Sequence, residues 1–215
     1  MDFILNPNLV LYLPLWELDG SSFMSKDAYG HLCTVTGALW QPDGRYFDGT
    51  DDDISCGTNI ALASAARGTV EFWIKFSTAG TEEWFLEIRE TTFTDYLAMR
   101  REAGNTLHIK IEDGNVTVTT LATVETITDT GFHHIVATQD GTGAKIYLDG
   151  IVCSVTGTNS TYWTAHLTTL SKVFVGKAAN WGVLEGWIGE VRIYNRALTP
   201  QEIQNIYLAT KWRYR

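Results

Sequence analysis

The feature that most constrains this chain is a two-residue alternation of side chains in several short segments. The clearest case is the segment 70–76, in which every even-numbered residue is apolar: Val70, Phe72, Ile74 and Phe76. Successive side chains of a β-strand point to opposite faces, so this pattern predicts a strand with one dry face and one wetter face. The segments 107–111 and 187–194 predict further strands.

Turn signals separate these strands, and helical periodicity is almost absent. Asp149 and Gly150 stand between two apolar segments, which predicts a hairpin with a type I′ turn. One short helix is expected near the C-terminus, with Thr199 as N-cap, Pro200 in its first turn and Glu202 closing a capping box. We therefore predict an all-β, two-sheet antiparallel β-sandwich (jelly roll) with one short C-terminal helix, as a single domain over residues 1–215.

Net charge and cysteine content argue against nucleic-acid binding, a zinc site and a redox motif. The formal net charge of −9 predicts that no nucleic acid is bound, because an acidic surface repels phosphate backbones. Some carboxylates could instead hold a hard cation such as calcium. Cys33, Cys56 and Cys153 form no C-x-x-C pair, so neither a zinc site nor a redox motif is expected. We expect three reduced, mostly buried thiols, with one disulfide as the alternative.

No targeting segment is expected in this chain. Residues 1–4 lack the basic start of a signal peptide, and Asn6-Pro7-Asn8 interrupts the apolar stretch. No segment approaches the ~20 apolar residues of a membrane span. We therefore predict no signal peptide and no membrane insertion, which leaves the location undefined by the residues themselves.

Segments in a fixed order carry a family resemblance: 11–16 with 27–31, 38–40 with 46–52, 70–76, 132–138 with 146–150, and 186–199 with 202–207. Together they resemble the laminin G-like jelly-roll family within the concanavalin A-like lectin/glucanase superfamily. The resemblance implies a jelly roll, and it favours an extracellular surface or a virion as the location. Members of the superfamily bind sugars, proteins or lipids, and a minority cleave polysaccharides, so the fold alone does not define a role.

The same resemblance implies a structural calcium ion. Its ligands would be Asp27 and the carbonyl of Gly30 in a D-x-x-G loop, together with Glu190, where many members carry Asp. The alternative is that Asp27 caps its own turn and Glu190 pairs with Arg192. A further acidic run, 51–53, does not have the alternate spacing of an EF-hand and is interpreted as a solvated turn.

Aromatic residues supply the candidate ligand contacts, because exposed rings stack on the apolar faces of pyranoses. Of the eight tryptophans, Trp84, Trp163 and Trp181 have polar, loop-like neighbours, and we predict that they bind ligand together with Tyr162. The alternative for each is packing over a sheet edge. The other strand-like tryptophans are assigned to packing in the core or on a sheet face: Trp16, Trp40, Trp73 and Trp187.

No catalytic residue is predicted. Polysaccharide hydrolases of this superfamily carry a strand of the form E-x-D-x-x-E, and retaining chemistry needs two carboxyls about 5–5.5 Å apart. Glu83 and Glu87 would share a strand face, but Phe85 stands where the central acid belongs. His133 and His134 would face opposite ways, and hydrogen-bonded structural roles are expected for both. We therefore predict that the chain is not an enzyme.

The C-terminal residues 211–215 alternate cationic and aromatic side chains. Trp212, Arg213 and Tyr214 are predicted partner-binding anchors, the alternative being an arm that packs on its own sandwich. The sequence thus predicts a non-catalytic recognition or adhesive domain that binds a glycan or a protein surface, most simply a lectin-like domain with structural calcium. The alternative is a decoration protein of a virion or other large assembly that binds partners through its surface and this arm.

Overall fold

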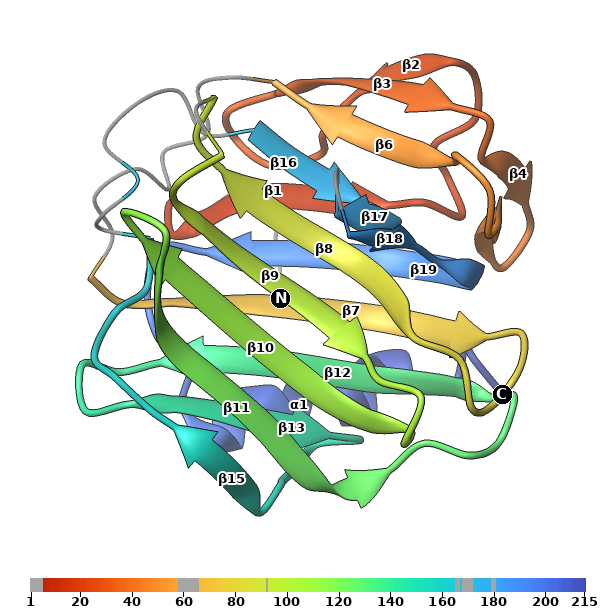
Figure 1. Ribbon diagram of the computed structural model, residues 1–215. Coiled ribbons are helices and arrows are strands. Elements are labelled where there is room, and N and C mark those ends of the chain that lie inside the picture. The colour runs from red at the N-terminus through yellow and green to blue at the C-terminus, as the bar shows by residue number, and fades with distance from the viewer. Residues whose placement is uncertain (1–5, 58–65, 92, 165–166, 168–171, 179–180) are drawn as a thin grey trace.

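The computed structural model describes residues 6–57, 66–91, 93–164, 167, 172–178 and 181–215, and within them two large antiparallel sheets lie face to face (Figure 1). A single short helix, α1 (Pro200–Thr210), packs behind one sheet. The predicted two-sheet β-sandwich with a C-terminal helix is confirmed. Residues 1–4, for which we predicted no signal peptide, lie outside the described residues.

The eight-stranded sheet has the order β14-β13-β12-β7-β19-β5-β4, with β1 also paired to β19. Its longest strand, β19, therefore has β7 along one edge and both β1 and β5 along the other. The strands of this sheet are β1 (Leu9–Pro14), β4 (Leu39–Gln41), β5 (Gly44–Asp48), β7 (Gly68–Phe76), β12 (Phe132–Gln139), β13 (Ala144–Leu148), β14 (Ile151–Val152) and β19 (Glu185–Tyr194).

The nine-stranded sheet has the order β15-β11-β10-β9-β8-β16-β6-β3-β2. A small hairpin, β17–β18, connects β16 to β19 and contacts β8. The strands are β2 (Ser22–Met24), β3 (Leu32–Thr36), β6 (Asp53–Cys56), β8 (Glu83–Arg89), β9 (Tyr96–Arg101), β10 (Thr106–Asp113), β11 (Val116–Thr126), β15 (Val155–Thr158) and β16 (Lys172–Val175), with β17 (Lys177–Ala178) and β18 (Gly182–Val183) in the hairpin.

The core lies between the two sheets and follows the predicted alternation. The even-numbered side chains of β7 are fully buried in it, together with side chains from β8, β9, β10 and β19. The opposite face of β7 differs from the prediction, because Glu71 and Trp73 are also buried. The helix α1 and the C-terminal residues cover that outer face, so the expected wetter side of the strand is dry.

The helix and the last hairpin form as the sequence predicts. The Thr199 side chain accepts a hydrogen bond from the Glu202 amide, and the Glu202 carboxylate accepts one from the Thr199 amide, which completes the capping box. Between β13 and β14, Asp149 and Gly150 have φ values of 51° and 79°, as a type I′ turn requires. Ile203 and Ile206 then bury one side of α1 against the outer face of the eight-stranded sheet.

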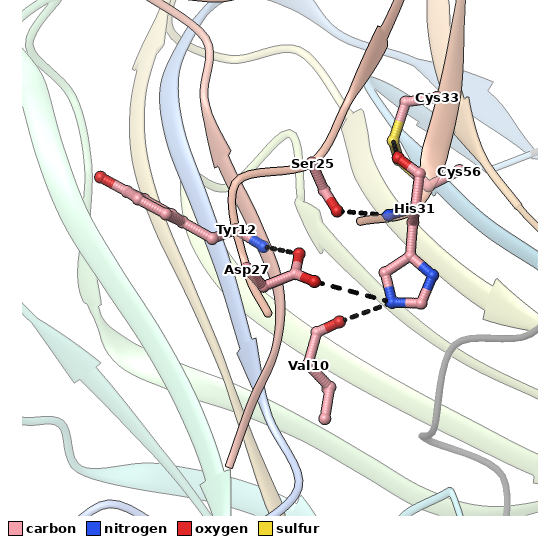
Figure 2. The surroundings of a disulfide bond; sticks show 7 residues. All are labelled: Val10, Tyr12, Ser25, Asp27, His31, Cys33 and Cys56. Atoms are coloured by element: carbon pink, nitrogen blue, oxygen red, sulfur yellow. Dashed lines mark hydrogen bonds and ion pairs between the residues drawn. A yellow bond between two sulfur atoms is a disulfide. The ribbon is translucent and has the colours of Figure 1, made fainter. Parts of the chain in front are cut away.

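A disulfide joins β3 to β6, where Cys33 and Cys56 are direct partners in the strand register, with Cα atoms 4.1 Å apart (Figure 2). Both residues are fully buried, and Cys153 is a buried free thiol. The prediction of three reduced thiols is therefore wrong. The prediction failed because the two cysteines meet only through the pairing of β3 with β6. The sequence around Cys33 and Cys56 does not show that these two strands are neighbours.

Removing this cross-link should destabilise the sandwich. Closing a loop of 23 residues restricts the unfolded chain and contributes about 3 kcal/mol. We expect the Cys33→Ser/Cys56→Ser variant, or the reduced protein, to lose that amount of unfolding free energy in urea titrations. As the control, Cys153→Ala should keep the full response to reductant. An unchanged urea midpoint after reduction of the parent protein would contradict this role.

Candidate functional site

A small aromatic cluster lies on the outer face of the nine-stranded sheet, apart from the main core. Trp84, Tyr96, Ala98 and Ala178 are buried against one another there. They come from β8, β9 and the β17–β18 hairpin, which packs on this face. We call Trp84, Tyr96 and Trp181 the outer aromatic cluster.

A bulge in β8 brings Trp84 to this outer face. The pairing of β8 with β9 shifts between Trp84 and Leu86, so that Phe85 and Leu86 both face the core. Trp84 and Glu87 consequently lie on the outer side, whereas Glu83 does not share their face. The sequence prediction placed Glu83 and Glu87 on one face, and the bulge is the physical reason that this was wrong.

Trp181 covers the cluster from the β17–β18 hairpin while keeping 52% of its surface exposed. Its ring stacks on Trp84 with centroids 6.0 Å apart and planes 26° apart, and it lies 6.3 Å from the ring of Tyr96. A side chain at Gly182 would come within 2.6 Å of the Trp84 ring, so this glycine lets the hairpin sit close to the sheet. The result is an indole that is supported by stacking on Trp84 and remains about half exposed.

Charged side chains from β9 and β10 surround these rings. The Lys110 Nζ lies 4.9 Å from the Trp181 centroid and 2.7 Å from a Glu112 oxygen. Arg100 lies 4.6 Å over the Trp84 ring and pairs with Glu102. Donors and acceptors therefore lie beside a half-exposed aromatic surface.

The ionisation of these groups suits a polar rim. Burial opposes ionisation of Glu112, but the hydrogen bonds from Lys110 and Tyr96 outweigh it and lower its pKa. Burial lowers the pKa of His108, and Arg100 lowers it further against the attraction of Glu102. The lowered pKa favours the neutral imidazole, whose Nδ1 lies 3.3 Å from a Glu102 oxygen.

The four aromatic residues predicted to bind ligand do not form one group. Trp84 and Trp181 are brought together on the outer face. Tyr162, 40% exposed, lies after β15, where its carbonyl accepts a hydrogen bond from Gln139. Trp163 is only 1% exposed and packs in the main core, where its ring cannot stack on a ligand. Gly68 makes room for it, since a Cβ there would lie 2.1 Å from the indole nitrogen.

The predicted calcium ligand Asp27 is occupied by backbone amides. Its Oδ1 accepts hydrogen bonds from the amides of Tyr29 and Gly30. Its Oδ2 accepts one from the amide of Tyr12 on β1, as Figure 2 shows. Asp27 thus caps its own turn and fastens that turn to the edge of the eight-stranded sheet. This is the alternative that the sequence left open for this residue.

The second predicted ligand, Glu190, belongs to a buried charged layer on the outer face of the eight-stranded sheet. This layer comprises Glu71, His134, Glu190 and Arg192, all nearly inaccessible to solvent. Arg192 pairs with both Glu71 and Glu190, and the other Glu190 oxygen accepts a hydrogen bond from the Tyr214 hydroxyl at 3.3 Å. Arg192 therefore satisfies a charge that a calcium ion would otherwise have to balance.

The set Asp27, Gly30 and Glu190 does not fit a calcium ion as folded. Calcium takes six to eight oxygen ligands, and the carboxylate oxygens here are already engaged by amides, a guanidinium and a hydroxyl. Near the predicted acidic turn, oxygens of Asp48, Asp51 and Asp52 lie within 4.8 Å of one another, but Asp52 accepts the Asp48 amide and Asp53 pairs with Lys177. We therefore propose that Asp27 and Glu190 stabilise the fold without a bound calcium ion.

Calcium removal provides a direct measurement. An ion that binds the folded state alone must raise the melting temperature. Because the carboxylates of Asp27 and Glu190 are engaged, we expect equal melting temperatures in millimolar calcium and in excess chelator. A clear rise with calcium that disappears in Asp27→Asn would contradict this interpretation of the turn.

The remaining titratable candidates have partners within the fold. Glu83 forms a 2.7 Å ion pair with Arg101, and burial raises its pKa to about 7 against the effect of that arginine. Glu87 pairs with Arg89 at 3.1 Å. His133 contacts Asp149 and Asp129, whereas the His134 Nε2 lies 3.2 Å from a Glu71 oxygen in the buried charged layer.

The C-terminal arm packs largely on its own sandwich. The Tyr214 ring is buried and stacks on Trp73 at 4.6 Å, and Arg213 lies 3.6 Å over the ring of Trp16. Trp212 is 66% exposed, with its indole nitrogen donating to the Ala209 carbonyl. Partner binding by Trp212, Arg213 and Tyr214 stays a prediction, of which Trp212 is the residue best placed to reach another molecule.

The buried charged layer predicts unequal roles for its two glutamates. Burial opposes ionisation of Glu71, but Arg192 and His134 outweigh it and lower its pKa, whereas burial raises the pKa of Glu190. Glu71→Gln should therefore cost about 3–5 kcal/mol, as expected when a buried ion pair loses one partner. Glu190→Gln should cost distinctly less, because the charge that it removes is itself penalised by burial.

Urea unfolding of both variants at neutral pH checks this contrast, and equal losses would contradict it. The pH dependence has a defined sign. The pKa of Glu71 in the folded protein lies below that of an ordinary glutamate. Ionised Glu71 therefore contributes its full stabilisation at a pH above the ordinary glutamate pKa. This stabilisation is lost as the pH falls through the folded-state pKa. Glu71→Gln should therefore flatten the acid limb of the stability curve.

The fold is a two-sheet β-sandwich, and the sequence comparison identifies its family. A model of the concanavalin A-like lectin/glucanases superfamily matches residues 48–204. The match covers more than half of the chain, which therefore belongs to this superfamily, as its resemblance predicted. No curated protein sequence matches the chain.

Solved structures share the fold at low sequence identity. Trypanosoma rangeli sialidase matches with a TM-score of 0.73 and 16% identity, over 98% of this chain and 34% of the sialidase chain. The botulinum neurotoxin serotype D/C binding domain matches with a TM-score of 0.67 and 12% identity, over 94% of this chain and 52% of the toxin chain. The chain thus spans about a third of the sialidase and half of the toxin domain. At these identities the likeness shows the fold alone.

One prediction is contradicted by these comparisons. The sequence predicted that the chain is not an enzyme, yet its structure matches sialidases, which are enzymes, over nearly its whole length. The sandwich therefore occurs within catalytic proteins, and the prediction was wrong to exclude that class. No helix in the described part of the chain is long and apolar enough to cross a membrane.

Proposed function

We propose that this domain recognises carbohydrate through the outer aromatic cluster on its nine-stranded sheet. The observation that carries the proposal is Trp181, an indole held by stacking on Trp84 yet left 52% exposed. Large exposed aromatic rings on a rigid scaffold are favoured contacts for ligands that have one apolar and one polar side. A pyranose has that character, since its C–H groups form an apolar face and its hydroxyls form a polar rim.

The charged residues around the ring give this surface its specificity. Lys110 and Arg100 provide donors, and Glu112 and Glu102 provide acceptors, all anchored by contacts within the sheet. Because each charge already has a partner, the surface is electrically balanced. We therefore expect a neutral sugar whose hydroxyls exchange hydrogen bonds with both members of each ion pair.

The comparisons support the class of ligand without identifying it. The superfamily description includes lectins and glucanases. One of the matching sialidase structures is a complex with sialic acid, with a TM-score of 0.71 and 16% identity. These are properties of other proteins, and for this chain they make carbohydrate the first ligand class to test.

Glycan-array binding tests the proposal. Trp181→Ala should lower binding of neutral glycans at least tenfold, because loss of a stacking ring costs on the order of 1–2 kcal/mol or more. The matched control is Leu208→Ala, which removes an apolar side chain of similar exposure (51%) from α1 on the other sheet. Binding that is equal in the parent and in Trp181→Ala would sink the proposal, as would no binding by the folded parent.

A further inference from the structure

A cleft lies on the side of the sandwich opposite to the outer aromatic cluster, where the C-terminal arm meets the eight-stranded sheet. Its volume is about 200 Å³, close to that of one small ring-shaped ligand. Its walls include Lys75 of β7, Phe132 of β12, Asp43 of the β4–β5 turn, and Arg213, Tyr214 and Arg215 of the arm. The proposed carbohydrate surface on the nine-stranded sheet contributes none of these residues.

Two of its cations are held in place by aromatic rings instead of carboxylates. The Lys75 Nζ lies 4.4 Å from the Trp187 centroid, and the Arg213 guanidinium lies 3.6 Å from the Trp16 centroid. A ring fixes a cation without cancelling its charge, whereas a carboxylate does both. Among the described residues, neither cation forms an ion pair, in contrast with Arg100 and Lys110 on the other sheet.

The charge of the cleft is unusual for this chain. Three cationic side chains and one acidic side chain, that of Asp43, line it, on a protein whose formal net charge is −9. A concave, partly enclosed surface concentrates the field of its charges. The side chains of this cleft therefore favour an anionic group.

The apolar wall of the cleft is rigid. The rings of Phe132 and Tyr214 lie 5.0 Å apart, and Tyr214 is fixed on its other side by Trp73 and by its hydroxyl bond to Glu190. Thr130 and Gly131 also line the cleft. Cations and an aromatic wall thus lie around one space.

We propose that this cleft binds a saccharide that carries a carboxylate. Lys75 and Arg213 hold the carboxylate, and Phe132, which is half-buried and supported by the buried Tyr214 ring, packs against the apolar face of the sugar ring. The surface charges favour this ligand over a neutral sugar, and the aromatic wall favours it over a bare inorganic anion. The proposal does not depend on the function assigned to the outer aromatic cluster.

NMR titration with three probes at fixed ionic strength tests it. D-glucuronate is the acidic sugar, D-glucose is the same ring without the carboxylate, and inorganic sulfate is the anion without a ring. We expect glucuronate to shift the signals of residues around the cleft, and the affinity read from those signals to be at least tenfold higher than that of either control. At these signals, equal affinities for glucuronate and glucose, tighter binding of sulfate, or no shifts with glucuronate would each overturn the proposal.

Variants separate this cleft from the rest of the molecule. Lys75→Gln and Arg213→Gln should each weaken glucuronate binding about tenfold, the loss expected for a charge-assisted hydrogen bond. Asp43→Asn should strengthen binding, because it removes the like charge, an effect that a merely structural role would not produce. Both controls should keep the parent affinity: Lys172→Gln, a half-buried lysine on β16, and Trp181→Ala.

Melting curves confirm that each variant is folded. If Arg213→Gln releases the arm, Lys75→Gln still tests the carboxylate contact from within β7. Unchanged affinity in folded Lys75→Gln would contradict the proposal. Because Trp181→Ala removes the proposed neutral-glycan surface but leaves this cleft intact, either proposal can fail while the other stands.

Discussion

The structure depends on one constraint: every long strand gives one of its two faces to a shared core. In β7 the whole even-numbered series is buried there, and β9, β10 and β19 contribute in the same way. Recognition chemistry is therefore confined to the two outer faces and to the loops between strands. The two outer faces differ: α1 and the C-terminal arm cover that of the eight-stranded sheet, whereas that of the nine-stranded sheet carries the half-exposed Trp181.

On the eight-stranded sheet the outer face is closed by α1 and the C-terminal arm. Beneath them Arg192 is fully buried between Glu71 and Glu190, and its pair with Glu71 offsets most of the cost of burying the guanidinium. Glu190 also accepts a hydrogen bond from the Tyr214 hydroxyl, so the charged layer stabilises the packed position of the C-terminal arm. Glu190, which the sequence predicted to bind a metal ion, thus connects the sheet to the C-terminal arm through a hydrogen bond. The arm in turn forms one wall of the cationic cleft.

Much of the fold could be predicted from local sequence. Alternation in 70–76, the Asp149–Gly150 turn and the Thr199 capping box are short-range signals, and the structure confirms each. What failed depends on contacts between distant segments. Trp163 has polar neighbours in sequence but enters the core because Gly68 leaves space for its ring. Cys33 and Cys56 bond because β3 pairs with β6.

The candidate site could be predicted only in part, because it also depends on contacts between distant segments. Trp84 and Trp181 could be selected from their polar surroundings, but no local pattern shows that a bulge turns Trp84 outward or that Trp181 stacks on it. Tyr96 and Lys110 join the site only through the register of β9 and β10 with β8. The exclusion of enzymes rested on a missing acid motif, and the match to sialidases shows that this fold does not support such an exclusion.

The central claim is that recognition occurs on the outer face of the nine-stranded sheet, around Trp181. Each of the eight tryptophans gives an indole signal in a ¹H–¹⁵N spectrum, and the exposed Trp40, Trp181 and Trp212 report on different parts of the surface. Titration with the neutral oligosaccharide that binds best on an array should move the indole signals of Trp181 and Trp84 and the amide signals of β8 to β10. Shifts that spare these signals and appear instead at the loops or over α1 would contradict the account.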